Sequence, residues 1–385
     1  MFHGSTIEIS AAALRANLDF IRGTLGKARL CSVVKGNAYG HGAGAFIPLA
    51  RSLGVDRFAV YSASEAFYVL AHVKREASIY IMGDVDGPAL EWAVEEGIAF
   101  NVFERQRLDM AIHAARTLKK AARIHLEVET GMHRTGFKLN ELPEVLEVCK
   151  ANMDALEIVG ICTHLAGAES LSNVPRIHRQ KTKYREALAI AERVGINVGL
   201  RHVACSAGVL NEPDILYDMA RVGILQYGFW PNRETEARYR TAHGLTDDPL
   251  RRVIRWWSNV MSVSTVPAGG YVGYGSAFEA PGERRIATIP VGYAFGYARS
   301  LSNSGHVLIR GQQAPVLGIV NMNCITVDVT HIPGVEKGDE AVLIGAQGER
   351  SISVSSFGDL SDQLNYELLT RLPHDIPRIV VEKHD

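Results

Sequence analysis

Cysteine is scarce in this chain and follows no pattern. The 385 residues include five cysteines, at the widely spaced positions Cys31, Cys149, Cys162, Cys205 and Cys324, with no C-x-x-C pair. Disulfide frameworks and cysteine zinc sites need paired or closely spaced cysteines. We therefore expect reduced thiols and a cytoplasmic protein.

Long apolar runs and an excess of one charge are also lacking. No uninterrupted apolar run approaches the roughly 20 residues that cross a bilayer. The start, MFHGSTIEIS, has neither the basic nor the apolar part of a secretory signal. The formal net charge of -1 gives no electrostatic footprint for nucleic acid or an anionic membrane. We therefore expect no membrane and no nucleic acid among the partners.

Several motifs of common catalytic and binding sites are absent. The chain has no Walker loop and no G-x-G-x-x-G, so nucleotide binding has no support. It has no G-x-S-x-G, the motif of one class of serine hydrolases. Neither H-E-x-x-H nor an acidic cluster with ligand spacing occurs, so no metal site is expected.

What the chain does contain is an alternation of short β-branched runs and longer amphipathic segments over residues 28–227. Eight strand candidates separated by helical segments are the number that a (β/α)8 barrel requires. A doubly wound open sheet is the alternative. Beyond Trp230 the chain offers short strand-like runs broken by glycine and proline, typical of a mostly β domain. The predicted class is α/β, a TIM-like barrel followed by a mostly β C-terminal domain.

These patterns also predict the domain boundaries. The barrel is expected over residues 11–232, a charged connection over 233–249 and the β domain over 250–385. We expect residues 1–10, which include TIEIS, to pair with the β domain. One helix within that domain is expected over 354–365, VSSFGDLSDQLN.

Polar residues stand where the predicted barrel strands end. These positions are Lys35, Glu129 with Arg134 just beyond, His164, Ser206 and Arg221. Reactive groups of such barrels collect at the carboxyl ends of the strands. Each residue alone has a structural alternative: a solvated flank for Lys35, a core histidine for His164, a turn or helix cap for Ser206. Their convergence on one face favours a site.

The residues around these positions resemble one known family. The stretch VVKGNAYGHG, from Val33 to Gly42, resembles the cofactor-lysine signature of the alanine racemases, with Gly36 where that family usually has alanine. Similar segments follow in the family's order along the whole chain: ETGMHRTG, THLAGAES, ACSAGVL, ARVGILQYG, VGYGSAF, IPVGYAFGY, APVLGIVNMN and NYELLTRLPHDIPR. The resemblance implies a pyridoxal-phosphate-dependent amino-acid racemase that forms a homodimer with shared active sites.

The resemblance also implies roles for individual residues. Lys35 is implied as the amine that carries the cofactor and as the base on one face of the substrate. Tyr274, contributed by the partner subunit, is implied as the second base, with His164 and, behind it, Arg221 setting its basicity. Arg221 would face the pyridine nitrogen. The implied phosphate contacts are Tyr39, Ser206, Gly223 and Ile224.

The substrate side is implied in the same way. Arg134 and the backbone of Met322 resemble the groups that receive the substrate carboxylate, and Tyr293 resembles a gate at the entrance. Glu127 falls where many members carry a carbamylated lysine, and we expect it to substitute as a fixed anion.

Four other positions depart from the family pattern, namely Cys205, Phe295, Asn323 and His374. Asn323 and His374 concern substrate choice more than the reaction. The preferred hypothesis for the function is therefore the racemisation of L-alanine to D-alanine. The alternatives are the same mechanism on another amino acid such as serine, or a pyridoxal-phosphate-binding regulatory or carrier protein without turnover.

Overall fold

The computed structural model describes residues 3–73, 75–354 and 365–384, so most of the helix expected over 354–365 lies outside the described residues. The chain divides into two compact units. We call them the barrel unit (Arg15–Lys35 and Ile47–Arg251) and the β unit (Met1–Leu14, Gly36–Phe46 and Arg252–Asp385). The short segment after Lys35 therefore belongs to the β unit, although the barrel surrounds it in the sequence.

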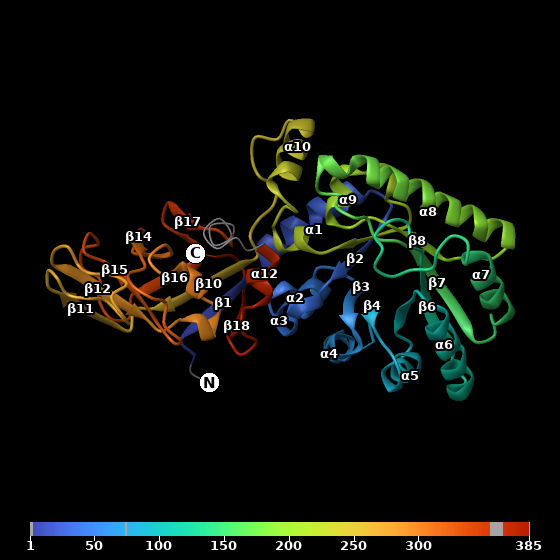
Figure 1. Ribbon diagram of the computed structural model, residues 1–385, viewed down its shortest axis with the longest axis horizontal. Helices are drawn as coiled ribbons and strands as arrows, with labels where there is room; N and C mark the ends of the chain where they lie inside the picture. Colours follow the sequence, from blue (N-terminus) through green and yellow to red (C-terminus); the bar gives the residue numbers. More distant parts are fainter. Residues whose placement is uncertain (1–2, 74, 355–364, 385) are drawn as a thin grey trace. The chain divides into compact units, whose positions relative to one another are not determined.

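The barrel unit is built on eight parallel strands (Figure 1). Their bounds are β2 Arg29–Val33, β3 Arg57–Ser62, β4 Ser78–Asp84, β5 Ala99–Val102, β6 Ala122–Glu127, β7 Leu156–Cys162, β8 Leu200–His202 and β9 Met219–Val222. They pair in the order β8-β7-β6-β5-β4-β3-β2-β9. Backbone hydrogen bonds from Asp218 N to Arg201 O (3.1 Å) and from Arg221 N to Ala204 O (2.9 Å) draw the two end strands together. The predicted barrel is confirmed, and the open-sheet alternative is wrong.

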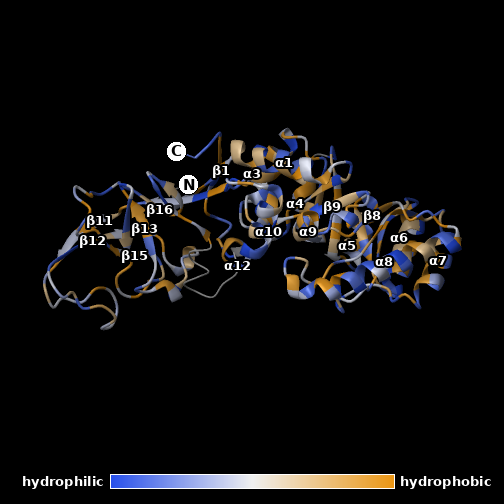
Figure 2. Ribbon diagram, turned by 90° about the horizontal axis from the view of Figure 1, so that it is seen from above, coloured by the Kyte–Doolittle hydropathy of each residue, from blue (hydrophilic) through white to orange (hydrophobic). Residues whose placement is uncertain are grey.

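Helices between the strands follow the amphipathic segments of the sequence. They are α4 Ala63–Val73, α5 Pro88–Glu95, α6 Arg105–Leu118, α7 Leu142–Ala151, α8 Val174–Val194, α9 Ser206–Asn211 and α10 Arg233–His243, with the short helices η1 Leu171–Asn173, η2 Pro213–Ile215 and η3 Ile224–Tyr227. In α6, Leu108, Ala111, Ile112 and Ala115 are buried. This is the spacing of one helix face, and Figure 2 shows apolar and polar residues alternating along such helices. Helix α10 lies in the segment 233–249 expected to be a connection.

The strands end slightly earlier than the sequence pattern indicated. Strand β2 ends at Val33 rather than Lys35, β6 at Glu127, β7 at Cys162 and β8 at His202. Arg221 lies inside β9. The apolar pattern runs on for a few residues because the backbone stays extended after the ladder ends, as the bond from Val34 N to Ala59 O (2.9 Å) shows. Lys35, Glu129, His164 and Ser206 therefore follow the strand ends by a few residues, whereas Arg221 lies within β9.

The β unit holds two sheets. The larger has the order β14-β13-β16-β10-β1-β18, with β17 paired to β16, and the smaller has the order β11-β12-β15. The bounds are β1 Ser5–Ser10, β10 Ile254–Asn259, β11 Ser262–Val266, β12 Arg284–Ile289, β13 His306–Ile309, β14 Gln312–Pro315, β15 Ile325–Asp328, β16 Glu340–Gln347, β17 Arg350–Ile352 and β18 Arg378–Val381. Strand β1 pairs with β10 antiparallel and with β18 in parallel, so both ends of the chain enter this sheet.

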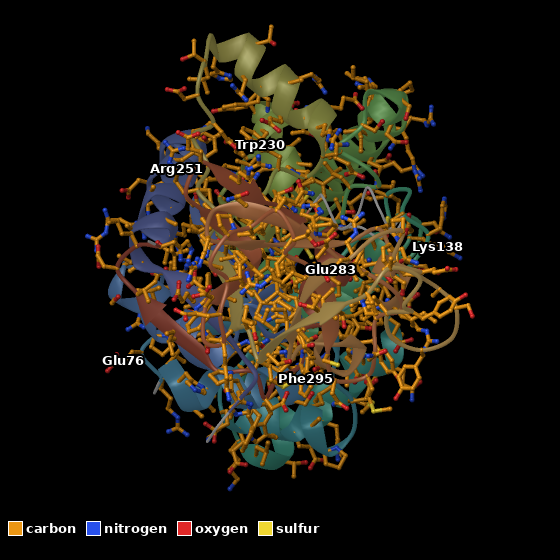
Figure 3. All side chains as sticks on the ribbon, turned by 90° about the vertical axis from the view of Figure 1, so that its left-hand side faces the viewer. Glu76, Lys138, Trp230, Arg251, Glu283 and Phe295 are labelled. Atoms are coloured by element: carbon orange, nitrogen blue, oxygen red, sulfur yellow. The ribbon has the colours of Figure 1, made fainter. Side chains whose placement is uncertain are left out.

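Short helical segments complete the β unit and link it to the barrel unit in the sequence. They are α2 Lys35–Tyr39, α12 Asn365–Thr370, η4 Tyr293–Phe295 and η5 Arg299–Leu301, together with α1 Ala11–Leu25 and α3 Ala43–Ser52, which pass from one unit to the other. Charged side chains such as Glu283 are exposed, and Phe295 is half-buried (Figure 3). Among the described residues, no helix is both long and apolar enough to span a bilayer.

Candidate active site

The segment after Lys35 is a single left-handed turn. The φ angles of Gly36, Asn37, Ala38 and Tyr39 are 61°, 55°, 54° and 51°. Only glycine adopts this region freely, and each of the other three residues costs about 1–2 kcal/mol there. Such a conformation persists only where the surroundings fix it. One of the fixing contacts is the hydrogen bond from Ala43 N to the Asn37 side-chain oxygen (2.8 Å).

The amine of Lys35 lies in an electropositive part of the barrel unit. Partial burial lowers the pKa of Lys35, and the positive charges of Arg134 and Arg221 lower it further, while Glu65 opposes them. A lowered pKa raises the fraction of neutral amine, which is the nucleophilic and basic form. Lys35 is thus suited both to bond a carbonyl compound and to accept a proton.

Arg221 is held rigidly at the centre of the barrel unit. Its guanidinium is buried. Nη1 donates to two acceptors of His202, the ring Nδ1 and the carbonyl oxygen, the latter at 3.1 Å. Nη2 donates to Thr163 O at 2.8 Å. The His202 ring is in turn hydrogen-bonded to the His125 ring, with 2.8 Å between His202 Nε2 and His125 Nδ1. The Nε of Arg221 has no hydrogen-bond partner in the described part of the chain, so one oriented donor remains for a bound molecule.

Arg221 also contacts a second histidine, because its Nη1 donates to the ring of His202. His164, expected in front of Arg221, is close enough to feel its charge. Burial lowers the pKa of His164 to about 3, and the charges of Arg221, Arg134 and Lys35 add to this effect. His164 is therefore neutral near pH 7 and can exchange hydrogen bonds without carrying charge. Sequence reasoning missed His202, although the strand candidate VGLRHVACS contains it.

Three of the four residues expected to bind phosphate come together in the barrel unit. Ser206 begins α9, and its hydroxyl oxygen accepts a hydrogen bond from Gly223 N at 3.0 Å. Ile224 follows Gly223 as the first residue of η3. The backbone N–H groups at such helix starts lack partners within the helix and suit an anion. The fourth residue, Tyr39, belongs to the β unit, where its ring meets the ring of Tyr366 at 6.1 Å between centroids.

Glu127 is the last residue of β6 and is buried. Its carboxylate accepts hydrogen bonds from Asn101 Nδ2 (3.0 Å) and Thr135 Oγ1 (3.1 Å). The hydroxyl of Tyr80 in turn donates to the Asn101 oxygen, which fixes the orientation of the amide. Burial raises the pKa of Glu127, whereas Thr135, Arg221, Arg134 and Asn101 favour the charged form. Asn101 and Tyr80 carry no motif, so nothing in the sequence pointed to them.

The loop that carries Arg134 is shaped by Glu129. Its carboxylate accepts hydrogen bonds from the backbone N–H groups of Gly131 and His133. Backbone bonds from Glu129 N to Phe137 O and from Phe137 N to Glu127 O, each 2.9 Å, close the base of the loop. Arg134 is exposed on this loop, so its guanidinium is available to an anionic ligand.

The remaining predicted residues lie in the β unit. Tyr274 is 72% exposed, and Met322 and Tyr293 are 53% and 39% exposed. Tyr293 and Met322 stand beside each other, because Tyr293 N donates to Asn321 O and Ala294 N to Met322 O, both at 3.0 Å. Asn323 and His374 are also exposed. A large exposed tyrosine such as Tyr274 is available to a second molecule.

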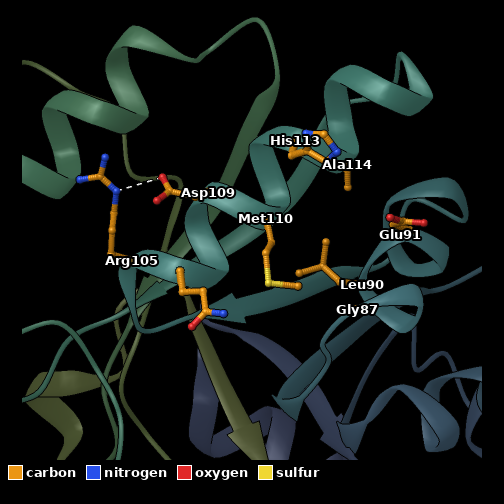
Figure 4. A pocket seen from close by; sticks show the side chains of 9 residues that line it. Gly87, Leu90, Glu91, Arg105, Asp109, Met110, His113 and Ala114 are labelled. Atoms are coloured by element: carbon orange, nitrogen blue, oxygen red, sulfur yellow. Dashed lines mark hydrogen bonds and ion pairs between the residues drawn. The ribbon is translucent and has the colours of Figure 1, made fainter.

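A surface pocket elsewhere in the barrel unit carries none of these residues. It lies between α5 and α6 and is lined by residues that include Leu90, Met110 and His113 (Figure 4). Its side chains come from helices rather than from the carboxyl ends of the strands. The convergence of Lys35, Arg134, His164 and Arg221, which share one electrostatic environment, therefore marks the candidate site.

The chain is similar to known proteins over nearly its whole length. Family models described as the alanine racemase N-terminal domain and the alanine racemase C-terminal domain match residues 9–231 and 253–380. An alanine racemase of Leptospira interrogans is 35% identical over 385 residues, covering 99% of this chain and 96% of that protein.

Solved structures are similar over the whole length as well. The alanine racemase of the D-cycloserine producer Streptomyces lavendulae has a TM-score of 0.89 at 29% identity, covering 99% of this chain and 98% of that one. The alanine racemase of Bartonella henselae, solved with covalently bound pyridoxal phosphate, has a TM-score of 0.84 at 26% identity, covering 99% and 100%.

Proposed function

This chain belongs to the alanine racemase family, and on that premise we propose that it interconverts L-alanine and D-alanine with pyridoxal 5'-phosphate as its cofactor. The observation that carries the proposal is the Lys35 amine, whose pKa is lowered within the same barrel that fixes the Arg221 guanidinium. The reaction class is isomerisation, and the substrate is a small amino acid.

The residues present fit this cofactor. An aldehyde needs an amine that is partly neutral, and Lys35 provides one. A pyridine nitrogen needs a donor, and the Nε–H of Arg221 is without a partner among the described residues. A phosphate group needs N–H and O–H donors, and the Ser206 hydroxyl and the Ile224 N–H lie together as such donors, joined through the Gly223 N–H, which donates to the Ser206 oxygen. When bound, the cofactor withdraws electrons from the α-carbon of the amino acid and makes its proton removable.

The two proton-transfer groups have different origins in this proposal. Inverting an α-carbon requires one base on each face, because a single base returns the proton to the side it left. Lys35 serves one face. The partner subunit's Tyr274 serves the other, with the neutral imidazole of His164 as its hydrogen-bonding neighbour. The 72% exposure of Tyr274 within one chain supports its use by a second copy, in a homodimer with shared active sites.

Arg221 limits the reaction to removal and return of the α-proton of the substrate. A guanidinium keeps its proton at physiological pH, so it donates to the ring nitrogen and disfavours a second positive charge there. Its two Nη groups are fixed by His202 and Thr163, which prevents it from turning away. By leaving that nitrogen without a proton, Arg221 would weaken the electron withdrawal that the bound cofactor supplies and would suppress side reactions such as transamination.

The substrate carboxylate is assigned to Arg134 and the Met322 backbone, and Tyr293 is assigned to the entrance. Glu127 is proposed as the fixed anion that orients Arg134, in place of the carbamylated lysine of many family members. The charge of Arg134 favours ionised Glu127, which supports an electrostatic link between the two. A carboxylate also performs this role without carbon dioxide.

Replacing Glu127 by glutamine is expected to raise the Michaelis constant for alanine about tenfold, because a neutral amide no longer polarises Arg134. Initial rates over a range of alanine concentrations, with and without added bicarbonate, provide the measurement. Bicarbonate should not change the wild-type rate. An unchanged Michaelis constant in the variant would contradict the proposed role.

A panel of single enantiomers tests the proposed function. Each enantiomer of alanine and serine is incubated with the cofactor-loaded protein, and the products are separated by chiral chromatography. Fast conversion of both alanine enantiomers is expected. The exposed polar side chains of Asn323 and His374 favour serine as the second candidate substrate, and racemisation of serine alone would establish it. A bound cofactor without any racemisation would instead indicate a regulatory or carrier protein.

The cellular location is a further part of the proposal. Cys31, Cys149 and Cys162 are buried as free thiols, and Cys205 and Cys324 are also unpaired. Free thiols suit a reducing compartment, which supports a cytoplasmic enzyme.

A further inference from the structure

Arg378 joins two segments of the β unit that both carry residues of the proposed site. It is the first residue of β18 and is held in the sheet by pairing with Ile7 of β1. Its Nη2 donates to Gly40 O at 3.1 Å, at the end of the left-handed turn that follows Lys35. Its Nη1 donates to Pro373 O (2.5 Å) and Ile376 O (2.7 Å), on the two sides of His374.

The same side chain also packs against the turn. The α-carbon of Gly42 lies so close to the Arg378 stem that a Cβ built on it would be 2.8 Å from Cγ. On the other side, a Cβ on Gly40 would lie 1.8 Å from Leu369 O, in α12. Figure 1 shows α12 and β18 beside α2. The turn is therefore enclosed between the end of α12 and the Arg378 side chain.

The charge of Arg378 is not used for an ion pair. No carboxylate lies within 4.0 Å of its guanidinium in the described residues, and its Nε is buried without a hydrogen-bond partner there. Its partners are carbonyl oxygens. Burying a guanidinium in this way is unfavourable. The arrangement instead fixes two segments relative to each other, because the planar guanidinium donates hydrogen bonds to both at once.

The turn needs this support. Asn37, Ala38 and Tyr39 are non-glycine residues in the left-handed region, and the turn reverts to an ordinary conformation unless its neighbours fix it. The Asn37 side chain holds it from within through Ala43 N. Arg378 holds it from outside.

We propose that Arg378 is a positioning residue that fixes the left-handed turn after Lys35 and the segment around His374 in one arrangement. It touches neither substrate nor cofactor, and its function depends on the proposed racemase site. It sets the direction in which Lys35 and Tyr39 leave the turn, and it couples them to His374, where substrate choice is proposed to be made.

The test compares two matched lysine variants, Arg378→Lys and Arg255→Lys. Both arginines belong to the β unit, and both have a buried Nε without a partner in the part of the chain that the structure describes. Arg255 differs in its partners, which are the carboxylates of Glu8 (3.3 Å) and Glu340 (2.6 Å). Lysine keeps the charge and most of the stem in each case. Its three donors share one nitrogen, so it cannot reproduce the planar fork in which Nη1 and Nη2 serve the two segments from separate nitrogens.

Hydrogen exchange and kinetics are measured on the full-length proteins. In Arg378→Lys, amide exchange over residues 36–42 and 372–377 should accelerate about tenfold or more, as expected for loss of a local contact. Cofactor release should also be faster, and the ratio of alanine to serine turnover per bound cofactor should change. Arg255→Lys should change none of these, whatever it does to the melting temperature.

Two outcomes would overturn the inference. One is that the amides of residues 36–42 exchange at the wild-type rate in Arg378→Lys, while they exchange faster in a further variant, Arg378→Met. This result would mean that only the charge of Arg378 matters. The other is an equal effect of Arg255→Lys on the two segments. Failure of the wild-type protein to racemise any amino acid would refute the proposed function instead, and the exchange comparison would still decide the role of Arg378.

Discussion

Replacing Lys35 by alanine is expected to lower the rate of alanine racemisation by about 10⁴-fold or more, the scale set by loss of a covalent anchor and a general base together. The neighbouring cations Arg134 and Arg221, which lower the pKa of Lys35, cannot replace it, because a guanidinium does not act as a base. The variant should also lose the borohydride-reducible absorbance of the bound cofactor. Absorbance spectra and chiral chromatography of the same sample provide both measurements.

Lysine 27 gives the control for this prediction. Lys27 is exposed at the other end of β2, two residues before the strand begins at Arg29. Lys27→Ala removes one positive charge close in sequence to the same strand and should leave the spectrum and the rate unchanged. Racemisation by Lys35→Ala within tenfold of the wild-type rate would remove Lys35 from the mechanism.

The barrel could be predicted from the sequence because its signals are local. The runs of β5 and β9 are buried at every position and apolar except for Asn101 and Arg221, and the intervening segments have helical spacing. Candidate site residues such as Lys35 and Ser206 could be predicted because they stand next to such runs. Four of the predicted strand ends, at Lys35, Glu129, His164 and Ser206, lie beyond the observed ones, since an extended backbone continues beyond the last ladder bond.

Other parts of the site depend on contacts that no local pattern encodes. The left-handed turn contains Ala38 and Tyr39, whose residue types predict ordinary backbone, beside Asn37, whose type tolerates this region. Its support comes from Arg378, more than three hundred residues away in the chain. The pairing of Arg221 with His202, and of Glu127 with Asn101, joins different barrel strands. Such partners become visible only when the strands are assembled into the barrel.

The position of Tyr274 leads to the second prediction with a large effect. Tyr274 is 72% exposed, and the hydrogen bonds within the described residues do not involve its hydroxyl. A base that must take up and return a proton needs a defined neighbour, which one chain does not supply. We therefore expect Tyr274→Phe to lower racemisation by about 10³-fold, the usual contribution of a general base, while one face of the substrate still exchanges its α-proton with deuterium from the solvent.

Mixing the two inactive variants decides which chain supplies the tyrosine. A heterodimer of Lys35→Ala and Tyr274→Phe chains contains one site with both Lys35 and the partner subunit's Tyr274, and one site with neither. Random exchange of equal amounts makes about half of the dimers mixed, so about a quarter of the wild-type activity per site should return, on the reasoning for closed two-fold assemblies. A tyrosine acting on its own chain's lysine would restore nothing, because every site would then lack one base. Recovery of activity on mixing, absent when either variant is mixed with itself, would therefore assign the second base to the partner subunit.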